Sequence, residues 1–426
     1  MAEAGSRARG SPRHGDFGAR CYTGTAVLRG ISGLPGSGSR RWFRPAKFHG
    51  AGHGWSIMHQ MTPIPRRALL ATPVPLLATA APPPILDTRV AIQGVCAWPK
   101  LIREEDGTIL AFIFNQPCHG LWEGDLDCWE SQDNGVHWRF RSRVAPHEPG
   151  TVRMNCAAGR TAGGGLIVIC GGWDKKGPPG SARMPGSRTI RPWVCRSADG
   201  GKSWTILREF PDPPPTETGR GEQYYPFGKI ETAADGSLCV AVYVARGNRR
   251  EAYLLRSRDG GATWNDRAPL NVQGGNETWI LHTGGGQWLA AGRRLDPAVS
   301  GHFMELLMSG DDARTWRRAM PLTLPRQING SLLRLQSGRI LFTFGNRTWG
   351  NFGVDARISD DNGATWSPPF RIARCPQADC GYPSSIQFPD GTVLTAYYTQ
   401  VSTDFHYEMR VTHWDPARFN KDGVPV

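Results

Sequence analysis

Five copies of one eight-residue pattern, Ser-x-Asp-x-Gly-x-x-Trp, recur between residues 131 and 366. Their starts lie 66, 60, 52 and 50 residues apart, and the fourth copy has Ala313 in place of the glycine. Repeats of this period are typical of modular β architectures, in which each repeat is one supersecondary unit. The copies occupy residues 131–138, 197–204, 257–264, 309–316 and 359–366.

Each copy has the chemistry of a tight turn between two antiparallel strands. Ser and Asp side chains hydrogen-bond to turn amides, and the glycine supplies a backbone conformation with positive φ. The tryptophan is an apolar anchor that holds the turn against its own sheet. We therefore expect a structural role, and no catalytic one, for the aspartates of the pattern, Asp133, Asp199, Asp259, Asp311 and Asp361.

A second repeat is interleaved with the first. Six short apolar runs, rich in β-branched residues, each follow a glycine-centred turn, which indicates the second strand of a hairpin. They lie at 106–112, 164–169, 235–240, 285–290, 337–342 and 390–395. Six hairpins, five of them followed by a Ser-Asp-Trp turn, predict an all-β fold, a six-bladed β-propeller of four-stranded antiparallel blades. We expect the segment near Val90 to Gly94 to supply the last outer strand and close the ring.

The first 87 residues do not fit this pattern, so the propeller is expected to span 88–426. Residues 1–86 hold 11 Lys and Arg against 2 acids, which accounts for +9 of the net charge of +13. Such a composition predicts a disordered basic tail, and it does not by itself predict nucleic-acid binding. Residues 61–81, with Arg66-Arg67 before a short apolar run, have the pattern of a signal peptide and are too short to span a membrane. We expect an exported protein, periplasmic or extracellular, without stable membrane insertion; the alternative is an unprocessed extension.

The ten cysteines allow local disulfides in an exported protein. Cys118/Cys128, Cys156/Cys170 and Cys375/Cys380 are possible pairs, and buried free thiols are the alternative. The sequence has neither a CxxC motif nor a His–Cys cluster, and it has no glycine-rich phosphate loop or dinucleotide fingerprint. We therefore expect no metal site and no cofactor.

The propeller topology places the candidate site on one face. Both kinds of turn fall on one face, so the loops between second and third strands lie over the other mouth of the channel, where function is expected. Nine residues before the glycine of each first hairpin, the inner strands bring six residues toward the axis: Trp98, Cys156, Phe227, Glu277, Asn329 and Tyr382. Arg153, Arg293 and Arg347 lie near that rim. Arginine forks match carboxylates, so the set predicts an anionic ligand.

The eight-residue turns resemble the Asp boxes, or BNR repeats, of the sialidase (neuraminidase) superfamily, and the resemblance covers essentially all of 88–426. The segments around Glu277 with Arg293, around Asn329 with Arg347, and around Tyr382 resemble the sialidase segments that carry the catalytic Glu, two arginines and the nucleophilic Tyr. The resemblance implies that Tyr382 is the nucleophile and Glu277 its base, since sialidases use a tyrosine where other glycosidases use a carboxylate. It also implies that Arg293, Arg347 and Asn329 bind substrate.

Two departures from the sialidase pattern bear on the substrate and on the proton donor. Sialidases carry a first arginine where this sequence has Cys96-Ala97-Trp98-Pro99, and Arg153 of the next blade is the candidate replacement. The family's acid/base Asp falls near His119 in the first long loop, which also holds Trp122, a candidate substrate contact. The candidate proton donors are His119, Glu123 and Asp125, with Asp296 and Asp404 as further alternatives.

These residues predict an exo-acting glycoside hydrolase of sialidase type that releases a terminal acidic sugar from a glycan. One alternative is a sialidase-fold enzyme of other specificity, a uronate-directed lyase or another exo-glycosidase. The other is a non-catalytic propeller that binds a glycan or a protein. Catalysis requires the side-chain oxygens of Tyr382 and Glu277 to lie within hydrogen-bond reach. The sequence does not predict an oligomeric state.

Overall fold

The computed structural model describes residues 86–174, 187–215, 222–246, 249–270, 274–296, 301–402, 405–419 and 422–424. The chain divides into two units, Met1–Pro75 and Leu76–Val426, and every described residue belongs to the second. The predicted signal peptide at 61–81 and the predicted disordered tail up to residue 85 lie outside the described residues. The last residue assigned to that tail, Asp87, is instead the first residue of a β-strand, Asp87–Gln93.

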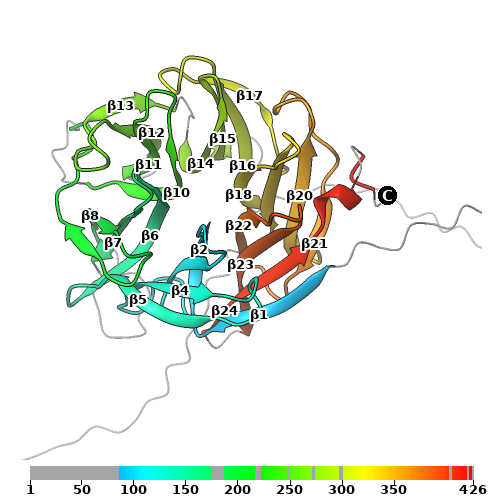
Figure 1. The fold of residues 1–426 in the computed structure, drawn as a ribbon, viewed down its shortest axis with the longest axis horizontal. Coiled ribbons are helices and arrows are strands. Elements are labelled where there is room, and N and C mark those ends of the chain that lie inside the picture. Colours follow the sequence, from blue (N-terminus) through cyan, green and yellow to red (C-terminus); the bar gives the residue numbers. More distant parts are fainter. Residues whose placement is uncertain are drawn as a thin grey trace, which may run out of the picture. The chain divides into compact units, whose positions relative to one another are not determined.

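The second unit is built from four-stranded antiparallel meanders set around a common axis (Figure 1). The innermost strands are β2 (Cys96–Arg103), β6 (Thr151–Arg160), β10 (Tyr225–Thr232), β14 (Gly275–Gly284), β18 (Gln327–Arg334) and β22 (Cys380–Gln387). The second strands are β3 (Ile109–Phe114), β7 (Leu166–Asp174), β11 (Leu238–Arg246), β15 (Gln287–Asp296), β19 (Ile340–Asn346) and β23 (Val393–Ser402). The third strands are β4 (Leu126–Ser131), β8 (Thr189–Ser197), β12 (Arg249–Ser257), β16 (Gly301–Ser309), β20 (Gly353–Ser359) and β24 (His406–Trp414). The outer strands are β5 (Arg139–Ala145), β9 (Thr205–Leu207), β13 (Asp266–Pro269), β17 (Arg317–Pro321), β21 (Phe370–Arg374) and β1 (Asp87–Gln93).

Four of the sheets among the described residues have four strands, and a fifth has eight. The eight-stranded sheet joins two meanders, β6–β9 and β10–β13, through parallel pairing of their inner strands. The inner strands approach closely at Gly159, where a Cβ atom would lie 2.3 Å from the carbonyl oxygen of Ile230. The fold is therefore an all-β propeller of antiparallel meanders, and the pairing of β1 with β24 confirms the predicted closure by the N-terminal segment.

The Ser-Asp-Trp turns join third to outer strands. In the first copy Ser131 Oγ donates to Asp133 Oδ1 (2.8 Å) and accepts from the Gly135 amide (2.9 Å), while Asp133 Oδ1 accepts from the His137 amide (2.9 Å). The amide hydrogen bond from His137, the largest effect, lowers the pKa of the Asp133 carboxyl to about 2. The same Ser-to-Asp hydrogen bond recurs at Asp199, Asp259, Asp311 and Asp361.

All nine described cysteines are free thiols. Cys156 and Cys170 face each other across β6 and β7, and both are buried. Burial raises the pKa of the Cys156 thiol to about 11 and that of Cys128 to about 12. Among the described residues, the alternative of buried free thiols therefore holds over the suggested local pairs.

The inner strands lose register with their second strands at corresponding positions near the channel mouth. The breaks lie at Cys96/Lys100, Arg153/Asn155, Phe227/Ile230, Gly275/Thr278, Gln327/Gly330 and Gly381/Ser384. A bulge bends its strand and re-aims a side chain, and bulges are frequent next to active sites. The six breaks therefore point to the channel mouth as the place where side chains of different sheets meet.

Candidate active site

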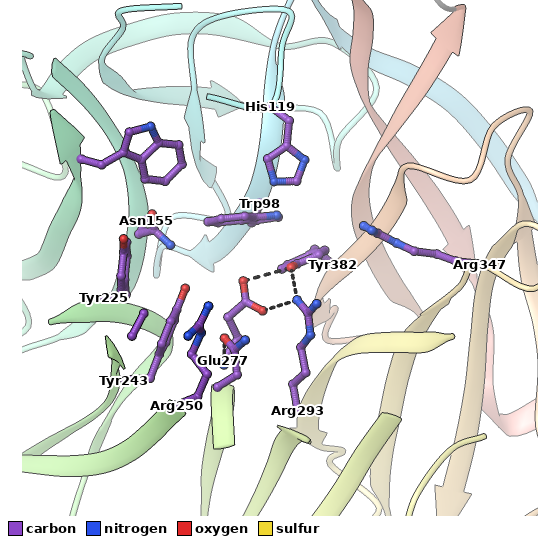
Figure 2. A pocket seen from close by; sticks show the side chains of 13 residues that line it. Trp98, His119, Asn155, Tyr225, Tyr243, Arg250, Glu277, Arg293, Arg347 and Tyr382 are labelled. Atoms are coloured by element: carbon purple, nitrogen blue, oxygen red, sulfur yellow. Dashed lines mark hydrogen bonds and ion pairs between the residues drawn. The ribbon is translucent and has the colours of Figure 1, made fainter. Parts of the chain in front are cut away.

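Tyr382 and Glu277 meet at the axis, although they belong to different sheets. Tyr382 Oη donates a 2.9 Å hydrogen bond to Glu277 Oε1. Arg293 Nη1 contacts both, at 2.6 Å from Glu277 Oε2 and 3.0 Å from Tyr382 Oη. Figure 2 shows the three side chains converging in this arrangement. A phenol, a carboxylate and a guanidinium thus share one hydrogen-bonded cluster.

Glu277 is buried, and its two oxygens have different partners. Oε2 accepts from Arg293 and, at 2.7 Å, from Asn329 Nδ2, so Oε1 is the oxygen that remains for Tyr382. Burial alone raises the pKa of the Glu277 carboxyl, but the charge of Arg293 and the hydrogen bonds from Asn329, Arg293 and Tyr382 outweigh it and hold the pKa below its ordinary value. Glu277 is therefore an ionised carboxylate able to accept a proton.

Aromatic rings enclose Tyr382. The Trp98 indole stacks on its ring, with centroids 5.0 Å apart and an angle of 19° between the planes, and Phe227 contacts it edge-on at 5.8 Å. The residue has a φ of 51°, in the left-handed region, directly after the bulge that begins at Gly381. Burial, and next the charge of Glu277, raise the pKa of the Tyr382 phenol far above its ordinary value.

Arg347 lies near the ring of Tyr382 and has a counterion of its own, Asp379. Its guanidinium carbon is 5.6 Å from the centroid of the Tyr382 ring, and its Nη2 lies 3.2 Å from Asp379 Oδ1. Nη2 also donates to Tyr398 Oη at 2.7 Å. Its positive charge is therefore partly matched within the protein.

A cavity of about 280 Å³ opens onto this cluster. That volume is close to the lower end of ordinary small-molecule sites, about 300–1,000 Å³. The lining residues come from inner strands and from the loops predicted to carry function: Trp98, His119, Asn155, Trp173, Tyr225, Tyr243, Ala245, Arg250, Asn276, Glu277, Arg293, Arg347 and Tyr382.

Of the predicted proton donors, only His119 lines this cavity among the described residues. Glu123 accepts from the Gly150 amide at 2.9 Å, outside the cavity. Asp125 is buried and holds His147, whose Nδ1 lies 2.6 Å from Asp125 Oδ1. Asp404 lies outside the described residues, as does the side chain of Asp296.

Three predicted substrate contacts do not line the cavity. Asn329 is fully buried, and its Nδ2 donates to Glu277 Oε2. Arg153 is 2% exposed, its Nη2 pairs with Glu148 (3.0 Å), and its guanidinium carbon lies 3.7 Å from a ring centroid of Trp193. Trp122 packs against Phe405, with ring centroids 5.7 Å apart. The structure therefore does not bring Arg153 to the position of the missing first arginine.

Several residues of the site were not singled out by the sequence. Asn155, rather than the predicted Cys156, lines the cavity, because the bulge in β6 skips one residue where those in the other inner strands skip two or three. Arg250 supplies a third lining arginine from the start of β12, and Tyr225 stacks on Tyr243 with centroids 4.8 Å apart.

Lys100 is buried beneath the cluster. Its Nζ donates to the Trp98 carbonyl (3.2 Å) and lies 4.3 Å from the centroid of the Phe227 ring. Burial, against the opposing charges of Cys156 and Glu277, lowers the pKa of the Lys100 ammonium to about 8. Lys100 is therefore a second positive group, besides Arg293, that acts electrostatically on Glu277.

The described residues offer neither a cluster of metal ligands nor a membrane-spanning helix. No group of three or more His, Cys, Asp or Glu in that part of the chain is placed to hold a metal ion. The described segments contain no helix with the length and apolar content that a membrane crossing needs.

Comparison with known proteins gives a family match and a set of structural likenesses. Residues 166–395 match the BNR repeat-like domain, and a search of curated proteins found no match. A protein of unknown function from Dyadobacter fermentans DSM 18053 is similar, with a TM-score of 0.63 and 22% identity, over 77% of this chain and 99% of that one.

Two solved sialidases are also similar. The Hadza microbial sialidase Hz136 has a TM-score of 0.55 and 16% identity over 75% of this chain. The Trypanosoma rangeli sialidase in complex with the inhibitor DANA has a TM-score of 0.56 and 17% identity over 76% of this chain. The chain spans 65% and 55% of the length of these two proteins. At such identities the likeness establishes the fold, a sialidase-like propeller.

Proposed function

The chain belongs to the BNR repeat-like domain family, within the sialidase-like propellers, and we propose that it is an exo-acting glycoside hydrolase that releases a terminal acidic sugar from a glycan. The observation that carries this proposal is the 2.9 Å hydrogen bond from Tyr382 to Glu277. A buried phenol paired with an ionised carboxylate at the floor of a cavity is the arrangement that a tyrosine nucleophile and its base need.

Proton transfer from Tyr382 and attack on the sugar must be concerted in this mechanism. The reference pKa values of Tyr and Glu, about 10 and about 4.3, differ by about 6 units, so a free phenolate would cost about 8 kcal/mol. The buried site increases that difference, because it raises the pKa of Tyr382 and lowers that of Glu277. Glu277 therefore accepts the proton as the bond between Tyr382 Oη and the anomeric carbon forms, while Arg293 stabilises the charge that develops on Oη.

The lining of the cavity supports a single acidic sugar as the group released. Arg250, Arg293 and Arg347 all border it, while Glu277 is the one carboxylate among the described residues that line it. A volume of about 280 Å³ suits one sugar ring rather than an extended chain. This supports an exo mode of action with a glycan substrate.

A uronate-directed activity is the second candidate, and one observation favours it. In the place where sialidases carry their first arginine, the Trp98 indole stacks on Tyr382, and Arg347 is paired with Asp379. Fewer unmatched arginines therefore surround the reacting carbon than a carboxylate on that carbon would need. A uronate carries its carboxylate elsewhere on the ring.

We infer that the eight-stranded sheet consists of two blades, so that the propeller has six blades. Each half of that sheet has the same inner-to-outer meander of four strands as the other sheets.

We also propose that the protein is exported, with residues 61–81 as its signal peptide. This proposal rests on the sequence pattern.

A panel of aryl glycosides tests the function directly. The panel contains sialosides, uronides and neutral sugars, and each is assayed with the wild-type protein and with Glu277→Gln. We expect hydrolysis of one acidic sugar class, with a large loss in Glu277→Gln. Saturable binding of sugars without turnover of any of them would instead identify a glycan-binding propeller.

A further inference from the structure

The loop between β3 and β4 places His119 at the rim of the cavity. The loop is held there by Gly120, whose φ is 64° and where a Cβ atom would lie 2.2 Å from Trp173 Cζ2. The Gly120 amide also donates to the Cys118 carbonyl at 2.8 Å. Trp173 lines the same cavity, so the turn that carries His119 is packed against the wall of the site.

One nitrogen of His119 is engaged by a carboxylate, and the other is not. His119 Nδ1 lies 3.1 Å from Asp379 Oδ2. Within the described part of the chain, Nε2 makes no hydrogen bond, and the side chain is 35% exposed. An ionised carboxylate only accepts hydrogen bonds, so Asp379 selects the neutral tautomer in which Nδ1 carries the proton and Nε2 carries the lone pair.

Asp379 is itself held in place by groups from three other strands and loops. Its Oδ1 accepts from Tyr398 Oη at 2.5 Å and lies 3.2 Å from Arg347 Nη2. Its Oδ2 accepts from Tyr407 Oη at 2.7 Å. Burial alone raises the pKa of the Asp379 carboxyl, but the charges of His119 and Arg347 and the hydrogen bonds hold it far below its ordinary range.

His119 and Tyr382 flank the same indole. Trp98 stacks on the Tyr382 ring, and its edge-on contact with His119 has centroids 5.4 Å apart and an angle of 78°. Figure 2 shows His119 across Trp98 from the cluster of Glu277 and Tyr382. Besides Asp379, Tyr398 contacts this imidazole edge-on, with ring centroids 6.1 Å apart, and Arg347 pairs with the Asp379 carboxylate that His119 contacts.

We propose that His119 is the proton donor of the reaction and that Asp379 is its positioning residue. The inference rests on the proposed function. A His–Asp dyad then stands where the sialidase resemblance implies a single Asp. Glu123 and Asp125 do not fill this role, because neither lines the cavity and both are bound to groups outside it.

In the first half of the reaction, the glycosidic C–O bond breaks and His119 Nε2–H gives its proton to the leaving oxygen. At the same time the bond between Tyr382 Oη and the anomeric carbon forms, and the phenol proton passes to Glu277. In the second half a water attacks the same carbon and gives a proton to Nε2. The Tyr382 Oη–carbon bond breaks, and Oη takes its proton back from Glu277.

The first test uses two substrates that share the sugar found in the panel but differ in leaving group, an alkyl alcohol and a nitrophenol. We expect His119→Ala to lose about 10²- to 10⁴-fold in rate on the alkyl glycoside and little on the nitrophenyl glycoside, because a good leaving group needs no proton. His147→Ala is the matched control, since His147 forms a similar pair with Asp125 outside the cavity.

The positioning role is tested by Asp379→Asn, which keeps the acceptor and removes the charge. We expect the same leaving-group pattern, smaller in size. A merely structural Asp379 would lower both rates equally. Spectra of protein labelled with ¹⁵N-histidine need no substrate, and should show neutral His119 protonated at Nδ1.

The outcomes separate the two proposals. A wild-type protein that cleaves no glycoside overturns the proposed function and the donor role together. Turnover with equal losses on both substrates in His119→Ala overturns the donor role alone. Neutral His119 protonated at Nε2 overturns the positioning role of Asp379, and this reading holds even where Asp379→Asn fails to fold.

Discussion

Tyr382 Oη and Glu277 Oε1 lie 2.9 Å apart across 105 residues of sequence. The two residues come from β22 and β14, which belong to different sheets. The contact therefore depends on the whole ring of sheets and not on any local segment. A tyrosine nucleophile needs its base within hydrogen-bond reach, and this distance meets that requirement.

Tyr382→Phe should abolish turnover while preserving the fold. The change removes one oxygen and keeps the ring that stacks on Trp98, and Glu277 keeps its contacts with Arg293 and Asn329. We expect the rate to fall by several orders of magnitude, with sugar binding retained in calorimetry and a nearly unchanged thermal midpoint. Turnover like that of the wild type would leave the sialidase likeness as one of fold only.

Asn155→Leu should not destabilise the protein. Asn155 is fully buried, and neither polar atom of its amide has a hydrogen-bond partner among the described residues. Replacing an unpaired buried amide by an apolar group of similar shape is close to neutral or stabilising. We expect a denaturation midpoint equal to or above that of the wild type.

Asn346→Leu is the matched control for that prediction. Asn346 is also buried, but its Nδ2 donates to Asp355 (2.7 Å) and its Oδ1 accepts from the Thr348 amide (3.0 Å). Its loss should cost about 1–3 kcal/mol, because Asp355 and the amide lose a partner. Equal destabilisation by the two substitutions would show that Asn155 has a structural partner after all.

Asp259→Ala should weaken the fold without affecting catalysis. The carboxylate accepts from Ser257 Oγ (2.7 Å), from the Thr263 amide (2.9 Å) and from Thr263 Oγ1 (2.7 Å), in a turn whose residues are not among those that line the cavity. We expect a loss of about 1 kcal/mol or more in unfolding free energy, with turnover per folded molecule retained. Asp266→Ala, which removes only an exposed ion pair with Arg258 (3.3 Å), should change stability little. Lost turnover in folded Asp259→Ala would place the site on the wrong face.

Lys100→Met should change how stability depends on pH. The folded pKa of Lys100 is lowered from 10.5 to about 8, so the unfolded chain binds more protons between those values and stability rises with pH in that window. The difference of about 2.5 units corresponds to about 3 kcal/mol. We expect the unfolding free energy of Lys100→Met to rise less than that of the wild type between pH 8 and 10.5, measured by denaturant titration. Parallel slopes in wild type and Lys100→Met would mean that Lys100 is solvated in the native protein.

The architecture was predictable because its signals are local. Each Ser-Asp-Trp turn satisfies its own amides, so the sequence alone locates the turn, and the regular alternation of turns with apolar runs then orders the strands. Glu277 and Tyr382 were found in the same way, since they occupy the same position in two repeats. The resemblance added their roles.

The residues that the sequence missed depend on contacts without a repeat. Asp379 lies in a crossover segment that has no equivalent to compare, and its importance comes from His119 and Arg347, far away in the chain. Counting along the repeats missed Asn155, because the bulge in β6 skips one residue where those in the other inner strands skip two or three. Arg153 was misjudged because its partners, Glu148 and Trp193, are seen only in three dimensions.

Glu277 links three sheets at the axis. The carboxylate belongs to β14, its Oε1 contacts Tyr382 of β22, and its Oε2 contacts Asn329 of β18. By contrast, β6 and β10 are joined through backbone pairing. In the proposed mechanism Glu277 takes the proton of Tyr382 and loses its negative charge while the sugar is attached to Tyr382. The hydrogen bond from Asn329 of β18 is charge-assisted only while Glu277 is ionised, so the strength of this contact between two sheets changes from one half of the reaction to the other.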